Sequence, residues 1–451
     1  MQSENRAVRI FWPIAILALV GLLVWLGFEG SAPGAGVVVI AAARAESAPA
    51  QQIPPVPAPR AASHLVPDLH PGQVEICGLG WVDPATAEAQ KDAVAAQIFA
   101  SAQSGSRALI TRLQQDSSPF AQAVGLMVQA FVEIEARRMK ERPTGGIEPC
   151  EGPECPEAIA RDKVMSELTN ELARRATQSN EPRLYALAFS MCRSPSPLPT
   201  CSSLSSRQWA RIDPENGTPW LFAAEADATG KPSATIDEVL FQIGKARRVD
   251  SQYFAVAGEI ARHVGKDDSS ILAASLAATE AIGVSAAQTI VPFKYLIQAC
   301  RDAALNDANR RQLCEGAVET LVNRSDSLLL ALIGTGMGRR LGWDATRTDE
   351  SRGLLAANMD SLSAGQGSQG ESMSCADVGK LLSRFGRQDE IGEVAHAREW
   401  IKQSGHTQAE YTQKARETRL RAEAEELARR QAQAVSAAKP PPRTPISSKP
   451  N

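Results

Sequence analysis

An uncharged apolar run near the N-terminus constrains this 451-residue chain more than any other feature. Residues 10–28, IFWPIAILALVGLLVWLGF, follow a short head that contains Arg6 and Arg9. The hydrocarbon core of a bilayer is about 30 Å thick and needs about 20 apolar residues of helix, so this run is long enough to span it. Basic residues stay on the cytoplasmic side of such a segment. We therefore expect a single-pass anchor in the inner membrane, with residues 1–9 in the cytoplasm and the body in the periplasm.

The alternative is a signal peptide that is removed, which would leave a periplasmic or secreted protein. Signal peptides have an apolar core of about 7–15 residues and a small-residue cleavage site close behind it. Ala43-Arg44-Ala45 has the required A-x-A form, but it lies 17 residues beyond Phe28 (45 − 28). This distance favours the uncleaved anchor, and cleavage near Ala45 stays open as the second interpretation.

Composition beyond the anchor predicts an all-α protein. Aromatic residues make up 5% of the chain, and good helix formers such as Ala, Leu, Glu and Arg are frequent. Residues 29–73 form a Pro/Ala-rich tether that cannot bury a core. Residues 74–403 hold the periodic apolar pattern of a folded body, whereas residues 404–451 read as a charged helix and a Pro-rich disordered tail. The net charge of −3 does not indicate nucleic-acid binding.

Helical periodicity recurs along the body. Between residues 119 and 139, large apolar side chains follow one another at spacings of three and four, which places them on one face of a helix. The same spacing predicts helices over residues 156–178, 235–248, 288–305, 309–323 and 326–341. Short polar turns join these segments, so we expect a repeat-like array of antiparallel helix pairs with essentially no sheet.

One stretch, residues 209–248, resembles the junction between tetratricopeptide repeats. It combines a D-P-x-N turn at residues 213–216 with a helix that begins near Trp220, and small residues follow at Ala223, Ala224, Gly230 and Ala246. The resemblance implies a concave surface that binds a protein, built from helix 218–229 and its neighbour 235–248. No second copy follows at a period of 34, so an irregular helical domain stays open as the alternative.

Three polar residues of this stretch are the candidate partner-binding residues. Glu225, Asp227 and Glu238 are expected to face outward on the two helices of the junction. Asp227 also stands where the repeat family usually has an aromatic residue. Trp220 would pack between helices, so it is expected to serve stability rather than recognition.

The eight cysteines predict disulfides, because thiols beyond the inner membrane meet an oxidising compartment. Cys192 and Cys201 flank a Pro-rich loop, SPSPLP. Cys300 and Cys314 each lie seven residues from Asp307 (307 − 300 and 314 − 307), where a turn between antiparallel helices would set them opposite one another. We expect a disulfide in each of these two pairs.

The remaining four cysteines allow three connectivities. Cys150 and Cys155 form a third local pair, in which case Cys77 and Cys375 tie the two ends of the body together. The sequence contains no C-x-x-C, and its spacings match no standard zinc site. A metal site is therefore the weaker interpretation of these cysteines.

Motifs of catalysis and cofactor binding are missing from the sequence. There is no H-E-x-x-H and no G-x-x-x-x-G-K-[ST]. Residues 365–370, GQGSQG, match G-x-G-x-x-G, but no apolar strand precedes them and no helical pattern follows, so a loop is the better interpretation. We therefore predict no catalytic residue, no metal and no cofactor.

These observations favour a membrane-anchored, extracytoplasmic helical scaffold or adaptor that binds a protein partner, with cell-envelope assembly as a natural setting. The alternative is an enzyme or ligand-binding protein whose site is assembled from scattered helix positions. A deep cleft with buried carboxylates would favour the second interpretation, and a shallow apolar and Arg-lined groove would favour the first.

Overall fold

The computed structural model describes residues 73–83, 91–141, 156–193, 198–225, 234–288, 293–301, 303–363 and 374–437. Those from residue 74 onward belong to one compact unit of the chain. The predicted membrane segment at 10–28 lies outside the described residues, and so do nearly all of the tether, the Cys150–Cys155 loop and Asp227.

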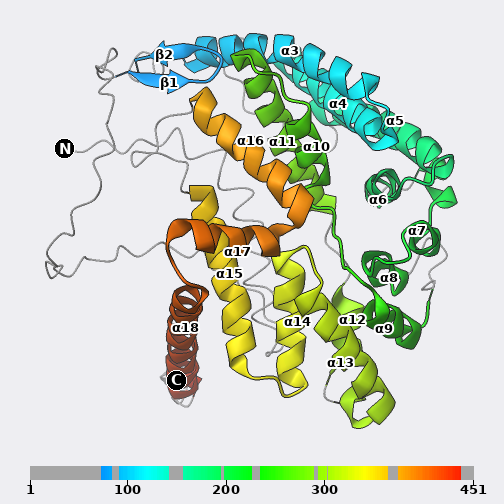
Figure 1. Cartoon of the computed structure of the whole chain (residues 1–451), viewed down its shortest axis with the longest axis vertical. Coiled ribbons are helices and arrows are strands. Elements are labelled where there is room, and N and C mark those ends of the chain that lie inside the picture. The colour runs from blue at the N-terminus through cyan, green and yellow to red at the C-terminus, as the bar shows by residue number, and fades with distance from the viewer. Residues whose placement is uncertain are drawn as a thin grey trace, which may run out of the picture. The chain divides into compact units, whose positions relative to one another are not determined.

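Helices dominate this part of the chain, as the composition predicts, and its sixteen α-helices carry the labels α3 to α18 (Figure 1). The first eight are α3 (Lys91–Gln115), α4 (Pro119–Glu141), α5 (Pro156–Thr177), α6 (Pro182–Met191), α7 (Ser206–Ile212), α8 (Thr218–Ala223), α9 (Ile236–Lys245) and α10 (Ala255–Arg262). The others are α11 (Asp268–Gln288), α12 (Phe293–Ala299), α13 (Ala308–Asn323), α14 (Leu328–Arg340), α15 (Ala345–Ser363), α16 (Cys375–Ile391), α17 (Glu393–Ser404) and α18 (Gln408–Ala437).

A small hairpin corrects the expectation of a body with essentially no sheet. Strands β1 (Val74–Ile76) and β2 (Gly80–Val82) pair antiparallel, with Glu75 opposite Trp81. The turn between them needs glycine, because Gly78 has φ +84° and few other residues adopt such a conformation without strain. Each strand has three residues, which is too short for the alternation that would reveal it in the sequence.

Three predicted helices change length in the structure, whereas the helix predicted at 119–139 is confirmed as α4. Helix α8 stops at Ala223 instead of 229. The segment 288–305 divides into α12, which ends at Ala299, and a short 3-10 turn, η3 (Ala304–Asn306). Helix α9 ends at Lys245, three residues before the predicted end. A second 3-10 turn, η2 (Pro199–Ser203), links α6 to α7.

Helices that are far apart in sequence pack side by side in the body. Helix α11 packs against α3, α10 and α16, and its first turn approaches α3 closely at Gly105. A Cβ at Gly105 would lie 2.0 Å from the Ser269 carbonyl oxygen, so only glycine fits there. Residues 268–286 of α11 are the one stretch of the described chain long and apolar enough to cross a membrane, by length and composition only. Within the body this stretch packs against α3, α10 and α16, and 39% of it is buried.

Three connections between helices lie side by side and form what we call the junction ladder (residues 213–217, 247–251 and 324–327). Asn216 pairs in parallel with Arg248, and Val249 pairs in parallel with Ser325. The Val249 amide donates to the Arg324 carbonyl over 2.9 Å. The connections between α7 and α8, between α9 and α10 and between α13 and α14 are therefore held in a fixed register.

Asn216 organises the first half of the junction ladder. Its side chain is fully buried and donates to Asp213 Oδ2 (3.0 Å) and to the Asp250 carbonyl (3.2 Å). Its Oδ1 accepts the backbone N–H groups of Thr218 (3.0 Å) and Asp250 (2.9 Å). A buried amide with both ends satisfied fixes geometry strongly, because any misplacement leaves a polar group unpaired. The D-P-x-N turn seen in the sequence is thus part of a long-range contact.

Three of the predicted disulfides are present in the described residues. They join Cys77 to Cys375, Cys192 to Cys201 and Cys300 to Cys314, with Cα–Cα distances of 4.5, 5.4 and 5.8 Å. Cys300 follows the end of α12, so this disulfide joins the helix end to α13 rather than linking two long antiparallel helices. Disulfides of this kind indicate an oxidising, extracytoplasmic compartment.

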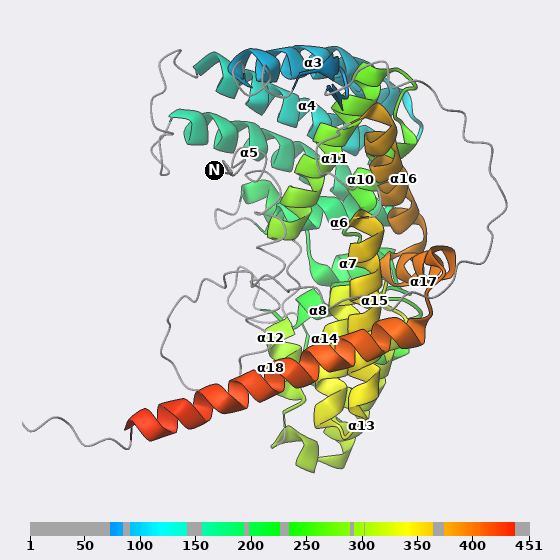
Figure 2. The same cartoon turned by 90° about the vertical axis from the view of Figure 1, so that its left-hand side faces the viewer.

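Helix α18 extends the packed body beyond residue 403. Its first half lies along α15, where Tyr411 is buried in a cluster with Leu354 and Ile401. Arg419 donates to both oxygens of Asp349 over 2.7 and 2.9 Å, and both side chains are largely buried. The C-terminal half projects past the other helices in Figure 2, with Leu427 exposed.

Candidate functional site

The predicted partner-binding residues are engaged in ion pairs where the structure describes them. Glu225 lies 3.0 Å from Arg193, and Glu238 accepts two hydrogen bonds from Arg207, of 3.0 and 2.8 Å. Asp227 lies outside the described residues. Glu225 and Glu238 remain partly exposed, so they can still contact a partner, but each would have to exchange an existing ion pair.

Phe241, an apolar residue that the sequence pattern did not single out, lies beside Glu238. Phe241 is three positions further along α9, hence on the same helix face, and 48% of it is exposed. The Lys245 amine lies 4.9 Å from the centre of its ring. Exposed aromatic rings flanked by charged groups are typical of protein-binding surfaces.

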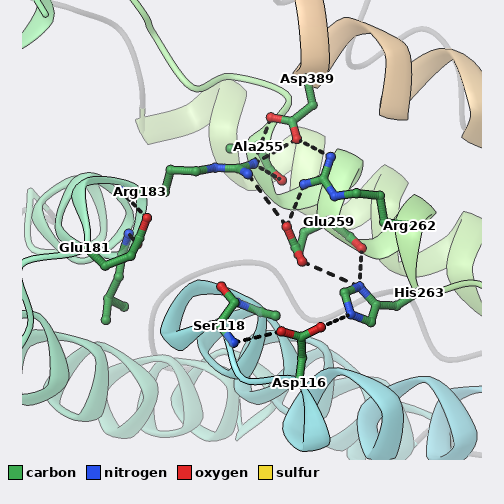
Figure 3. Close-up of polar contacts among 11 residues, drawn as sticks. Asp116, Ser118, Glu181, Arg183, Ala255, Glu259, Arg262, His263 and Asp389 are labelled. Atoms are coloured by element: carbon green, nitrogen blue, oxygen red, sulfur yellow. Dashed lines mark hydrogen bonds and ion pairs between the residues drawn. The ribbon is translucent and has the colours of Figure 1, made fainter. Parts of the chain in front are cut away.

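Elsewhere, four charged side chains from three helices form a closed ion-pair network, the charged junction (Figure 3). Arg183 of α6 donates to both oxygens of Asp389 of α16 over 2.8 Å. Arg262 of α10 lies 2.7 Å from Asp389 and 2.5 Å from Glu259. Asp389 and Glu259 are largely buried, and the two positive and two negative charges cancel. The network joins α6, α10 and α16 without leaving a net charge inside.

Local sequence places these groups on facing surfaces. Helix α6 begins at Pro182, and the Glu181 side chain accepts the backbone N–H of Arg183 over 3.1 Å, which fixes the first turn. On α10, Glu259, Arg262 and the following His263 are spaced three and four residues apart and therefore share one face. Gly258 allows α16 to approach, because a Cβ there would lie 2.3 Å from the Cβ of Asp389.

His263 extends the charged junction to the turn between α3 and α4. Its Nε2 lies 3.0 Å from Asp116 Oδ2, and its Nδ1 lies 2.9 Å from the Glu259 carbonyl oxygen. The hydrogen bond from the Ser118 backbone N–H and the contact with His263 hold the pKa of Asp116 below its usual value. Asp116, His263 and Glu259 thus form a row of polar contacts that continues the charged junction.

The contacts of Arg262 in the charged junction favour its ionised form. Burial alone would lower the pKa of Arg262, but hydrogen bonds to Glu259 and Asp389 outweigh this and raise it. None of the groups of the charged junction lines the hollow described below. The arrangement acts as a clamp between helices. Arg183 and Asp389 are 206 residues apart, so no local motif could have revealed their pairing.

Three acidic side chains gather at the junction ladder and its contact with α17. Asp326 accepts the Ser251 backbone N–H (2.9 Å) and hydroxyl (3.0 Å), and it hydrogen-bonds to Asp250. Glu393 accepts the backbone N–H of Leu328 over 3.2 Å. Burial raises the pKa of Asp250, Asp326 and Glu393, and the proximity of Asp250 raises that of Asp326 further.

Because these raised pKa values mean that the folded state binds protons more tightly than the unfolded chain, stability falls as the pH rises from about 4 through the raised values. We expect Asp326→Asn, which is nearly isosteric, to raise the urea midpoint at pH 8 and to lose this advantage toward pH 4. The gain arises because the asparagine amide does not ionise and therefore avoids the cost of a buried carboxylate charge. Asp344→Asn is the control, since hydrogen bonds with Thr346 lower the pKa of Asp344. Equal pH profiles for both variants would contradict the expectation.

A hollow of about 630 Å³ lies beside the charged junction, between α10, α16 and α17 and the first turn of α11. Lys380, Arg384 and His396 contribute its polar lining together with Ser383 and Gln403, and no carboxylate lines it. In the described part of the chain, no three His, Cys, Asp or Glu side chains are placed so that they could hold a metal ion. The buried acids of the junction ladder do not line this hollow either.

Comparison with protein-family models finds no match for this chain, and comparisons with curated proteins and with solved structures find none. The function is therefore argued from the geometry of the chain itself.

Proposed function

We propose that this chain is a membrane-anchored, extracytoplasmic helical scaffold that binds a protein partner, in the setting of cell-envelope assembly. The observation that carries the proposal is the junction ladder, which places three helix connections side by side in parallel register. Helical arrays of this kind present extended surfaces whose shape is set by contacts between neighbouring units. The three disulfides support a body that works outside the cytoplasm.

The surface of α8 and α9 is the proposed partner-binding region. It combines the exposed Phe241 ring with the Arg207–Glu238 ion pair, and Arg207 also lies 5.8 Å from the Trp220 ring centre. Hot spots of protein interfaces are enriched in aromatic residues and arginine and are surrounded by polar groups. Charge reversal at Glu238 alone tests this region poorly, because it also breaks the ion pair with Arg207.

Phe241→Asp is the sharper test. The first step is to show that the protein itself remains in carbonate-washed membranes. Partners are then cross-linked, captured from gently solubilised membranes and quantified by mass spectrometry. We expect the partner recovered with the wild type to fall at least tenfold with Phe241→Asp, because a buried aromatic anchor contributes more than about 1.4 kcal/mol.

Ile159→Asp on α5 is the matched control, since Ile159 is 58% exposed and lies on another helix. Both substitutions should leave the melting temperature nearly unchanged, as surface changes do. Equal recovery with the wild type and both variants would place the binding surface elsewhere. Release of the protein as a soluble species that begins at Glu46 would show that the N-terminal segment is a cleaved signal peptide and not an anchor.

A further inference from the structure

The hollow between α10, α16 and α17 has the size and lining of a small-molecule site. Ligand pockets of proteins span about 300–1,000 Å³ and combine an apolar wall with a few polar groups. Here the apolar wall comes from Ala261, Val264, Ile271 and Leu382, and Trp400 adds an aromatic surface. The volume of about 630 Å³ lies in the middle of that range.

Arg384 contributes a positive charge to the lining of the hollow. Arg384 donates from Nη1 to the Leu362 carbonyl over 3.2 Å, and no carboxylate among the described residues forms an ion pair with its guanidinium. Burial lowers the pKa of Arg384. Partly buried arginines are usually paired, because an unpaired charge away from water is costly. Arg384 therefore has unused capacity to bind an anion.

His396 also lines the hollow. Its Nδ1 lies 3.3 Å from Asn358 Oδ1, an oxygen that also accepts the amide of Gln388 over 2.9 Å. Burial and the nearby Arg384 charge lower the pKa of His396. Lys380 lies on the same wall, although Asp377 pairs with it over 2.9 Å. Among the described residues that line the hollow, Arg384 is therefore the cation without a carboxylate partner, and apolar side chains form much of the remaining lining.

From this juxtaposition we propose that the hollow binds a small amphipathic anion, a carboxylate or phosphate with a short apolar body, through Arg384. The oxygens of a carboxylate or a phosphate accept hydrogen bonds from the paired N–H groups of the Arg384 guanidinium, whose spacing matches both ligand types. The apolar body covers the wall formed by α10 and α11. This site is independent of the partner-binding surface on α8 and α9.

Isothermal titration calorimetry on the full chain tests the proposal with four probes of defined chemistry. Octanoate and octyl phosphate carry both features, octylammonium keeps the apolar body with the opposite charge, and inorganic phosphate is an anion without an apolar body. We expect the two amphipathic anions to bind at least tenfold more tightly than either of the others. Equal binding of octanoate and octylammonium would overturn the proposal, and so would tightest binding of inorganic phosphate.

Three substitutions locate the site. Arg384→Gln should weaken octanoate binding ten- to a hundredfold, the effect of losing a charge-assisted hydrogen bond, and Arg384→Lys should restore part of it. Arg398→Gln is the matched control, because Arg398 is exposed on α17, and its binding should stay within twofold of wild type. Equal loss in Arg384→Gln and Arg398→Gln would contradict the assignment.

Gly379→Leu tests the site with a substitution that should fill the hollow and leave the protein folded. Gly379 lines the hollow, and a Cβ added there meets no atom within 4 Å, so the new side chain would occupy the open space. Leucine also favours helix over glycine, so α16 should remain folded. We expect octanoate binding to be lost while the melting temperature is kept. Retained binding in this variant would show that the ligand lies elsewhere.

Discussion

Replacing Asp389 with alanine is expected to lower the free energy of unfolding by about 3 kcal/mol. Asp389 is the carboxylate shared by Arg183 and Arg262 in the charged junction, and its side chain is 9% exposed. Its loss leaves Arg183 and Arg262 with Glu259 as the one remaining carboxylate of the charged junction. Breaking a buried ion pair costs about 3–5 kcal/mol, and the lower end applies because both arginines are about a third or more exposed. Urea unfolding followed by far-UV circular dichroism measures the effect.

Glu390→Ala is the matched control for this substitution. Glu390 is the next residue of α16 and pairs with Arg387 over 2.8 Å, but its side chain is 65% exposed. Exposed ion pairs contribute about 0–1 kcal/mol. If both variants lost the same stability, the charged junction would not be what holds α6, α10 and α16 together.

Removal of the Cys77–Cys375 disulfide should have a still larger effect. The two cysteines are 298 residues apart, so the cross-link strongly restricts the unfolded chain. The chain-entropy treatment gives about 5.7 kcal/mol for a loop of this length, as an upper value. The double substitution Cys77→Ser with Cys375→Ser should therefore lower the melting temperature markedly under non-reducing conditions.

The short disulfide offers the comparison. Cys192 and Cys201 are 9 residues apart, for which the same treatment gives about 3 kcal/mol. The double serine variant of this pair should lose less stability than that of Cys77 and Cys375. The opposite order would show that strain or residual structure, rather than loop length, decides the contribution of these disulfides.

The parts of the fold that the sequence predicts well are those set by local pattern. Helix α4 was predicted within two residues of its end because Phe120, Val124 and Met127 are buried along one face. Helix α11 escaped prediction, since its alanine-rich surface is apolar on most sides and gives little periodicity. The cysteine pairs followed from spacing and from the order of the chain.

The sites depend on contacts that no local pattern encodes. Asp389 pairs with Arg183, which is 206 residues away in the sequence. Arg384 lines the hollow together with residues of α10, and this depends on the packing of α16 against α10. The D-P-x-N turn at residues 213–216 is a second example of a contact that local pattern does not encode. The sequence indicated Asp213 and Asn216 as a turn, but their pairing with Arg248 and Asp250 depends on the register of the next helix pair.

The Cys77–Cys375 disulfide also determines how the protein would respond to mechanical tension. A pull between the two ends of the chain enters at residue 77 and passes through the covalent sulfur bridge directly to residue 375. Residues 78–374, and with them helices α3 to α15, stay off the line of force. Among the described elements, β1, α16, α17 and α18 are the ones that lie on this line, so the junction ladder would keep its shape while the oxidised protein is stretched.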